Sequence, residues 1–199
     1  MQSINDSSRM DIRFTDALKL SRHDAFHVMV KPAGPLCNLN CTYCYYLEKK
    51  KLFPEKKVFK LSDDLLENFI KQYIEVQQVP VVTFTWQGGE PTLLGLDYFQ
   101  RVIKLQRKYS NGKMVENAFQ TNGTRLTDDW CMFFTDNDIL VGISVDGEEH
   151  NHNYYRKSNS GKPVFKKVMK GIELLQKNQN EIFLVLLLMN WDLKLFLAH

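Results

Sequence analysis

Hydrophobic and polar residues along this chain switch repeatedly between two patterns. Short apolar runs rich in β-branched and aromatic residues, which are typical of strands, alternate with longer stretches whose apolar residues recur at helical spacing. The predicted strands cover residues 26–31, 80–86, 114–120, 139–145 and 182–189. The predicted helices follow Ser62, begin at Asp97, follow Thr127 and cover residues 164–176. Ser62 and Thr127 are residue types that cap helix N-termini, which supports these two starts.

This alternation gives four strand–helix units followed by a fifth strand. Such a series predicts an α/β fold in which a parallel sheet carries its helices on the outside. Right-handed crossovers curl a parallel sheet toward a barrel, but five strands cannot close an eight-stranded one. We therefore expect a partial, open (β/α) barrel with four β/α units plus a fifth strand.

Composition narrows the class of protein further. The 199 residues are 44% hydrophobic and 25% charged, which is an ordinary globular balance. A net charge of +3 is too small to indicate nucleic acid or a membrane surface as a partner. Residues 1–31 contain no apolar stretch like that of a secretory signal, so we expect a cytoplasmic protein. The lysine-rich stretch between Cys44 and Ser62 predicts a solvated surface excursion.

Three of the four cysteines, Cys37, Cys41 and Cys44, crowd into a C-x3-C-x2-C segment after the first predicted strand. Cysteines so close together do not indicate a disulfide framework, and they favour a metal in a reducing compartment. Three thiolates can hold three irons of a [4Fe–4S] cluster and leave the fourth iron open. Zinc is the alternative, and it would need a fourth ligand, for which His23 and His27 are the nearby candidates.

A second candidate segment, Gln87-Gly88-Gly89-Glu90-Pro91, follows the second predicted strand. The carboxyl ends of the strands are where a (β/α) barrel places its active site. Two glycines let a backbone edge approach a ligand closely and leave its polar groups free to bind it. An isolated segment of this kind is usually a plain turn, but one β/α unit after the cysteines it favours a ligand site.

Further polar residues follow the third and fourth predicted strands. The Gln-Thr-Asn-Gly segment at 120–123 is equally consistent with a turn and with a ligand role. Ser144 offers a hydroxyl suited to a ribose, and the guanidinium of Arg156 could pair with a carboxylate through two N–H groups. We expect His150 and His152 to be solvated loop histidines.

The cysteine spacing, with an aromatic residue before the last cysteine, resembles the signature of the radical SAM superfamily over roughly residues 26–178. The resemblance implies that an open iron of the [4Fe–4S] cluster chelates S-adenosylmethionine, which is then cleaved reductively to a 5′-deoxyadenosyl radical. It implies cluster binding by Cys37, Cys41 and Cys44. It also implies S-adenosylmethionine contacts from Tyr43, Gln87, Gly88, Gly89, Glu90, Ser144 and Arg156. The segment Gly88-Gly89-Glu90 would hold the methionine amino group, Arg156 its carboxylate, and Ser144 the ribose.

Within that superfamily, KPAGPLCNLNCTYCYY, FTWQGGEPTLLGLDYF, QTNGT and GISVDG look like the anaerobic sulfatase-maturating enzymes. Gln87 before the two glycines belongs to this likeness. The resemblance implies oxidation of a Cys or Ser side chain in a sulfatase to formylglycine. It implies as partners a polypeptide substrate and a reduced electron donor such as ferredoxin or flavodoxin.

The resemblance also divides the chain. We expect an N-terminal extension over residues 1–25 and a radical SAM core over 26–199, C-terminally incomplete and without the family's auxiliary-cluster domain. Residues 181–199 are unlike the expected fifth strand. Two explanations stay open, namely a truncated or frameshifted reading of a longer gene, or a divergent short terminus. Two other functions stay open as well, namely radical SAM modification of another peptide and non-catalytic iron–sulfur binding.

Overall fold

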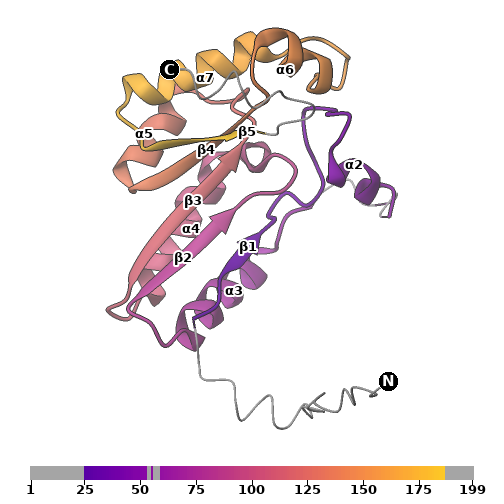
Figure 1. Ribbon diagram of the computed structural model, residues 1–199. Coiled ribbons are helices and arrows are strands. Elements are labelled where there is room, and N and C mark those ends of the chain that lie inside the picture. The colour runs from indigo at the N-terminus through magenta and orange to yellow at the C-terminus, as the bar shows by residue number, and fades with distance from the viewer. Residues whose placement is uncertain (1–24, 53–54, 56–58, 187–199) are drawn as a thin grey trace, which may run out of the picture.

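The structure, a computed structural model, describes residues 25–52, 55 and 59–186, and its centre is one parallel β-sheet (Figure 1). The strands are paired in the order β1-β2-β3-β4-β5, so that β1 and β5 are the two edges of an open sheet. Their bounds are β1 Val28–Val30, β2 Val81–Trp86, β3 Met114–Thr121, β4 Ile139–Val145 and β5 Ile182–Leu186. The predicted parallel, open α/β fold is confirmed. The predicted continuation of the fifth strand over 187–189 lies outside the described residues.

Helices cover one face of this sheet, and in Figure 1 α3 and α4 lie behind β1 to β3. The helices are α2 Tyr45–Lys50, α3 Asp63–Val76, α4 Leu96–Tyr109, α5 Asp128–Asp136, α6 Glu149–Tyr155 and α7 Phe165–Lys177, with a 3₁₀ turn η1 at Pro91–Leu94. Both predicted caps are confirmed, because Ser62 Oγ accepts from Leu65 N and Thr127 Oγ1 from Trp130 N. The short helices α2 and α6 were not predicted; they fall in stretches interpreted as a surface excursion and a loop.

Among the described residues, none of the helices has the length and apolar content needed to cross a membrane.

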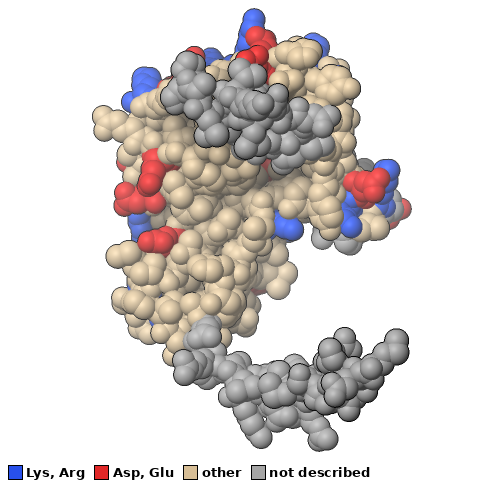
Figure 2. All heavy atoms as spheres, in the orientation of Figure 1, with Lys and Arg blue, Asp and Glu red and all other residues tan. Residues whose placement is uncertain are grey.

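The hydrophobic core fills the space between the sheet and its helices, because alternate strand residues point to opposite faces. On β2, for example, Val82, Phe84 and Trp86 are buried in the core that α3 and α4 share with the strands. The opposite, inner face carries uncharged side chains where it lines the cavity, among them Thr85 and Ala118, and one acidic side chain, Glu116, nearer the amino end of β3. Figure 2 looks onto this face and shows few Lys, Arg, Asp or Glu side chains over β1 to β3. Because the helices of the described residues cover the other face, the inner face is left open to a ligand.

β1 is shorter than predicted, because side chains of α3 and of its C-cap residue form hydrogen bonds with the backbone of Phe26. Gln77 Nε2 and Tyr73 Oη both donate to the Phe26 carbonyl oxygen, at 2.8 and 3.0 Å. A backbone group bound to a side chain no longer extends the sheet ladder, so the strand begins only at Val28.

A small polar network lies inside the core between β2, β3 and α4. Asn117 Oδ1 accepts from Trp86 Nε1 at 2.8 Å and from Gln106 Nε2 at 2.9 Å, and Asn117 Nδ2 donates to Gln106 Oε1 at 3.0 Å. All three side chains are buried. Buried polar groups are tolerated when they bind one another, so this network fixes how α4 sits on the sheet.

We predict that Asn117→Ala destabilises the fold by about 2 to 4 kcal/mol, because it leaves the Trp86 and Gln106 donors buried without their acceptor. Urea unfolding measures the change. The control is Glu116→Ala, an exposed neighbour on the same strand, which should stay within about 0.5 kcal/mol. Equal effects of the two substitutions would show that the network contributes nothing.

Candidate active site

The three clustered cysteines lie on the loop from β1 to α2, and Cys44 is the N-cap of that helix. The loop is held from outside by the end of α6 and the residues just after it. Asn40 N donates to the Lys157 carbonyl at 2.7 Å, and Thr42 N donates to the Tyr155 carbonyl at 2.9 Å. The cysteine loop therefore depends on a segment more than a hundred residues further along the chain, an anchor that sequence reasoning missed.

A cavity of about 730 Å³ opens at the carboxyl ends of the strands and brings nearly all the predicted site residues together. Its lining includes Cys37, Cys41, Tyr43, Cys44, Gln87, Gly88, Gly89, Ser144 and Arg156. Strands β1 to β4 contribute through their last residues and the loops that follow them, because parallel strands end at the same edge of the sheet. Of the ten predicted residues, Glu90 alone lies outside this lining.

The three thiols share one cavity. Burial raises the pKa of Cys37 to about 11 and that of Cys41 to about 12, and the nearby Cys44 sulfur raises both further by like-charge repulsion. Three free cysteines line one cavity, and three is the number of protein thiolates that a [4Fe–4S] cluster with one open iron takes. A tetrahedral zinc ion would need a fourth protein ligand to close its coordination.

The zinc alternative gains no support from the histidines. His27 is exposed just before β1, at the amino end of the strand, whereas the cysteines follow its carboxyl end. His23 lies outside the described residues.

The two-glycine turn after β2 packs directly against the cysteine loop. Gly88 and Gly89 have φ values of 85° and 52°, in the left-handed region that favours glycine. A Cβ atom on Gly89 would collide with the carbonyl oxygen of Leu36, the residue before Cys37. Glu90 N donates to that same oxygen at 2.7 Å. The glycines are therefore required for the turn to lie against the cysteine loop.

Glu90 differs from the other predicted residues because its carboxylate is fully buried beneath the cavity. Oε1 accepts from Thr92 N, Thr92 Oγ1 and Thr121 Oγ1, at 3.1, 2.6 and 2.7 Å, and Oε2 accepts from Asn122 N at 2.8 Å. Burial raises the pKa of Glu90, and these hydrogen bonds work against the rise. The carboxylate ties the two-glycine turn to the loop after β3.

Tyr43 and Arg156 meet at a buried aspartate that sequence reasoning missed. The Tyr43 hydroxyl donates to Asp146 Oδ2 at 2.5 Å, and Arg156 Nε lies 2.9 Å from the same oxygen. The guanidinium also lies over the Tyr43 ring, 5.4 Å from its centre. Asp146 stands two residues after Ser144, whose hydroxyl accepts from Gln120 Nε2 at 3.0 Å. One buried carboxylate thus joins the cysteine loop to the end of β4.

The radical SAM superfamily model matches residues 32–193, most of the chain. This chain belongs to the radical SAM superfamily. A serine-type anaerobic sulfatase-maturating enzyme of Bacteroides thetaiotaomicron is 52% identical over 152 residues, 76% of this chain and 37% of that protein. A cysteine-type enzyme of Clostridium perfringens is 39% identical over 156 residues, 77% of this chain and 42% of that protein.

A solved structure resembles this radical SAM domain closely. It is native anSMEcpe with bound AdoMet and the Cp18Cys peptide, with a TM-score of 0.72, 36% identity, and coverage of 79% of this chain and 42% of that one. The chain spans about two fifths of the length of the curated relatives it matches.

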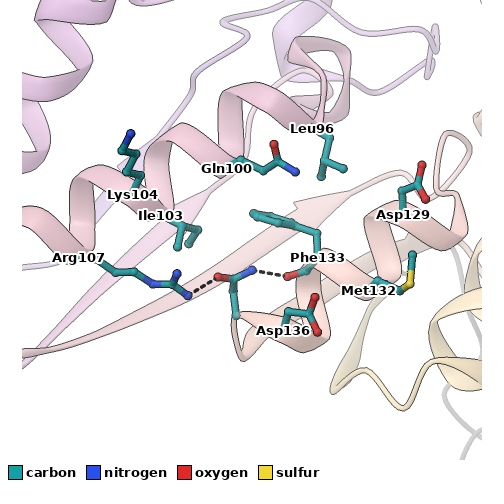
Figure 3. A pocket seen from close by; sticks show the side chains of 10 residues that line it. Leu96, Gln100, Ile103, Lys104, Arg107, Asp129, Met132, Phe133 and Asp136 are labelled. Atoms are coloured by element: carbon teal, nitrogen blue, oxygen red, sulfur yellow. Dashed lines mark hydrogen bonds between the residues drawn. The ribbon is translucent and has the colours of Figure 1, made fainter.

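A second hollow of about 780 Å³ lies between α4 and α5, outside the radical SAM motifs (Figure 3). Side chains of both charges line it, with Lys104 and Arg107 from α4 and Asp129 and Asp136 from α5. Arg107 is already paired with Asn137 at 2.9 Å. The hollow contains none of the predicted site residues and is a feature of the outer helical layer.

The expectation for His152 was wrong, because the residue lies in α6 and its side chain is fully buried. Its ring packs against Phe165, and Asp146 N donates to Nδ1 at 3.3 Å, which requires an unprotonated nitrogen there. Burial, and then the nearby Arg156 charge, lower the pKa of His152 to about 4. His150, on the same helix, is exposed as predicted, but it lies in a helix rather than a loop.

We predict that acid destabilises this radical SAM domain partly through His152. Its folded pKa of about 4 lies below the ordinary value of 6.5, so the unfolded chain takes up the proton first. Stability is therefore lost as pH falls from about 6.5 toward about 4, by about 2 kcal/mol between pH 7 and pH 5.

Urea unfolding at the two pH values tests this prediction. His152→Gln should lower stability at pH 7 but flatten the pH dependence. The matched control is His150→Gln, which should keep the wild-type slope because that side chain is exposed. A His152→Gln variant with the wild-type slope would contradict the assignment.

Proposed function

We propose that this chain is the S-adenosylmethionine-binding core of a radical SAM enzyme of the anaerobic sulfatase-maturating type. One observation carries the proposal: three free cysteines, a two-glycine turn, Ser144 and Arg156 all line one cavity at the carboxyl edge of the sheet. The sequence identity to maturating enzymes and the structural likeness to one with bound AdoMet support the choice within the superfamily.

Cys37, Cys41 and Cys44 would hold a [4Fe–4S] cluster and leave one iron without a protein ligand. When bound, the cluster supplies the electron that cleaves S-adenosylmethionine to methionine and a 5′-deoxyadenosyl radical. The protein contributes the surroundings of that cluster. Cys41 packs with Leu39 and Val164 in a small apolar cluster on which Cys37 and Cys44 also pack. This packing buries Cys41 and so limits the access of water and oxidants to its sulfur.

Other cavity residues would bind S-adenosylmethionine. Beside Gln87, Gly88 and Gly89 offer a backbone edge that would bind the methionine amino group. The buried Glu90 carboxylate holds this turn in place through its hydrogen bonds to the loop after β3. Ser144 would bind the ribose. Tyr43 would contact the cofactor beside the cluster.

Arg156 would bind the methionine carboxylate. Its ion pair with Asp146 uses Nε, and the two terminal nitrogens of a guanidinium can still pair with a carboxylate.

The substrate would be a polypeptide, with a Cys or Ser side chain oxidised to formylglycine. The relatives are named as serine-type and cysteine-type maturating enzymes, and the neighbouring structure holds the Cp18Cys peptide as well as AdoMet. The uncharged part of the inner face that lines the cavity would place the Cβ of such a side chain against the radical and exclude water. A reduced ferredoxin or flavodoxin would supply electrons, and free thiols suit the cytoplasm.

We predict that anaerobic reconstitution gives about four irons per chain, and that dithionite plus S-adenosylmethionine then yields 5′-deoxyadenosine. Cys37→Ala, Cys41→Ala and Cys44→Ala should each abolish product. Cys131→Ala is the matched control, because this cysteine is buried in α5 and does not line the cavity. Cys131→Ala should keep both cluster and product, apart from a modest loss of stability.

The outcomes separate the candidate functions. A cluster whose spectrum does not respond to S-adenosylmethionine would favour non-catalytic iron–sulfur binding as the function of this chain. Production of 5′-deoxyadenosine without modification of a Cys or Ser sulfatase peptide, followed by mass spectrometry, would favour a radical SAM modifier of another peptide. Zinc in anaerobically purified protein would contradict the proposal.

We predict that Arg156→Lys weakens S-adenosylmethionine binding by roughly tenfold, because lysine keeps the charge but loses the paired N–H donors. Equilibrium dialysis against the cluster-loaded protein measures the affinity. Arg125→Lys, at an exposed position, is the control and should bind as the wild type does. Unchanged affinity in Arg156→Lys, with iron content intact, would remove Arg156 from the proposed site.

A further inference from the structure

Asn122, the second-to-last residue of the 120–123 segment, reaches from the loop after β3 to the first cysteine. Its Nδ2 lies 3.7 Å from Cys37 Sγ and 3.0 Å from Asn38 Oδ1. A backbone donor reaches the same sulfur, with Leu39 N at 3.3 Å from Cys37 Sγ. Two N–H groups therefore point at one cysteine sulfur, one from its own loop and one from a different β/α unit.

The orientation of the Asn122 amide is fixed by its other contacts. Asn122 Oδ1 accepts from Thr124 N at 3.0 Å and from Thr124 Oγ1 at 2.7 Å. A backbone N–H can only donate, so the oxygen of Asn122 must face Thr124. The NH₂ group then necessarily faces Cys37 and Asn38.

The backbone of Asn122 is held as firmly as its side chain. Asn122 N donates to the buried Glu90 carboxylate at 2.8 Å, and the side chain of Thr121 donates to the same carboxylate. Only 7% of Asn122 is exposed. A donor held this way keeps its position when the sulfur becomes a metal-bound thiolate, which is a stronger acceptor than the thiol.

We propose that Asn122 sets the reduction potential of the cluster by donating a hydrogen bond to Cys37 Sγ. This rests on the proposed function, because it requires a [4Fe–4S] cluster on Cys37. Reduction adds negative charge to the cluster and its sulfurs, and an N–H donor stabilises the reduced form more than the oxidised one. Asn122 therefore raises the potential and eases reduction of the cluster by the electron donor.

The test is a redox titration, followed by electron paramagnetic resonance, on the reconstituted protein without S-adenosylmethionine. Asn122→Ala removes the donor and should move the midpoint potential to a more negative value. Asn122→Asp keeps an oxygen for Thr124 but replaces the donor with a negative charge, so it should move the potential further in the same direction.

Thr124→Val is the matched control. It removes the hydroxyl that bonds Asn122 Oδ1 and Asn38 Nδ2, but it leaves the Thr124 backbone N–H and the Asn122 donor in place. If the potential responded to general loosening of this loop, Thr124→Val would shift it as well. We expect the wild-type potential instead.

Iron and sulfide analysis precedes each titration and separates the possible failures. A wild-type protein without a [4Fe–4S] cluster would overturn the proposed function together with this inference. A loaded Asn122→Ala variant with the wild-type potential, or a shift no larger than that of Thr124→Val, would overturn the inference alone. Loss of the cluster from both Asn122 variants, with Thr124→Val still loaded, would replace the tuning role with an anchoring one.

Discussion

The parallel pairing of β1 to β4 is the constraint on which the site depends. In a parallel sheet every strand ends at the same edge, so four loops that are far apart in the sequence converge there. The cysteine loop and the two-glycine turn follow β1 and β2, the segment at 120–123 includes the last two residues of β3, and Ser144 is the second-to-last residue of β4. A shift of one residue in the register of any strand would turn its last side chains to the opposite face and remove one part of the site.

Two buried carboxylates hold these loops together after the sheet has brought them close. Glu90 joins the two-glycine turn to the loop after β3, and Asp146 joins the cysteine loop to Arg156. Burying a carboxylate is unfavourable unless donors surround it, so each one fixes the positions of the groups that bind it. The surroundings of the proposed cluster are therefore made rigid by Glu90 and Asp146, which are not part of the lining of its cavity. Asn122 connects the buried Glu90 carboxylate to the proposed cluster, because it binds both Glu90 and Cys37.

Residues whose role depends on local sequence were predicted well. Ser62 and Thr127 cap the helices that they were expected to cap, because capping involves only the next three residues. Residues whose role depends on distant partners were not. His152 has the local sequence of a solvated histidine, but the packing of α6 against α7 buries it beside Phe165. Likewise, nothing near Phe26 in the sequence indicates that Gln77 and Tyr73 delay the start of β1.

By itself, the sequence determined the alternation of strands and helices, the cysteine spacing and the glycine pair, because periodicity, capping and metal-ligand spacing are local properties of a chain. Only the tertiary structure decided which polar groups lie in the cavity and which lie beneath it. Glu90 and Gly89 are neighbours in the sequence, but one carboxylate is enclosed by Thr92, Thr121 and Asn122 while the glycine lines the cavity. That division follows from how strands pack side by side, which brings together residues separated by thirty or more positions.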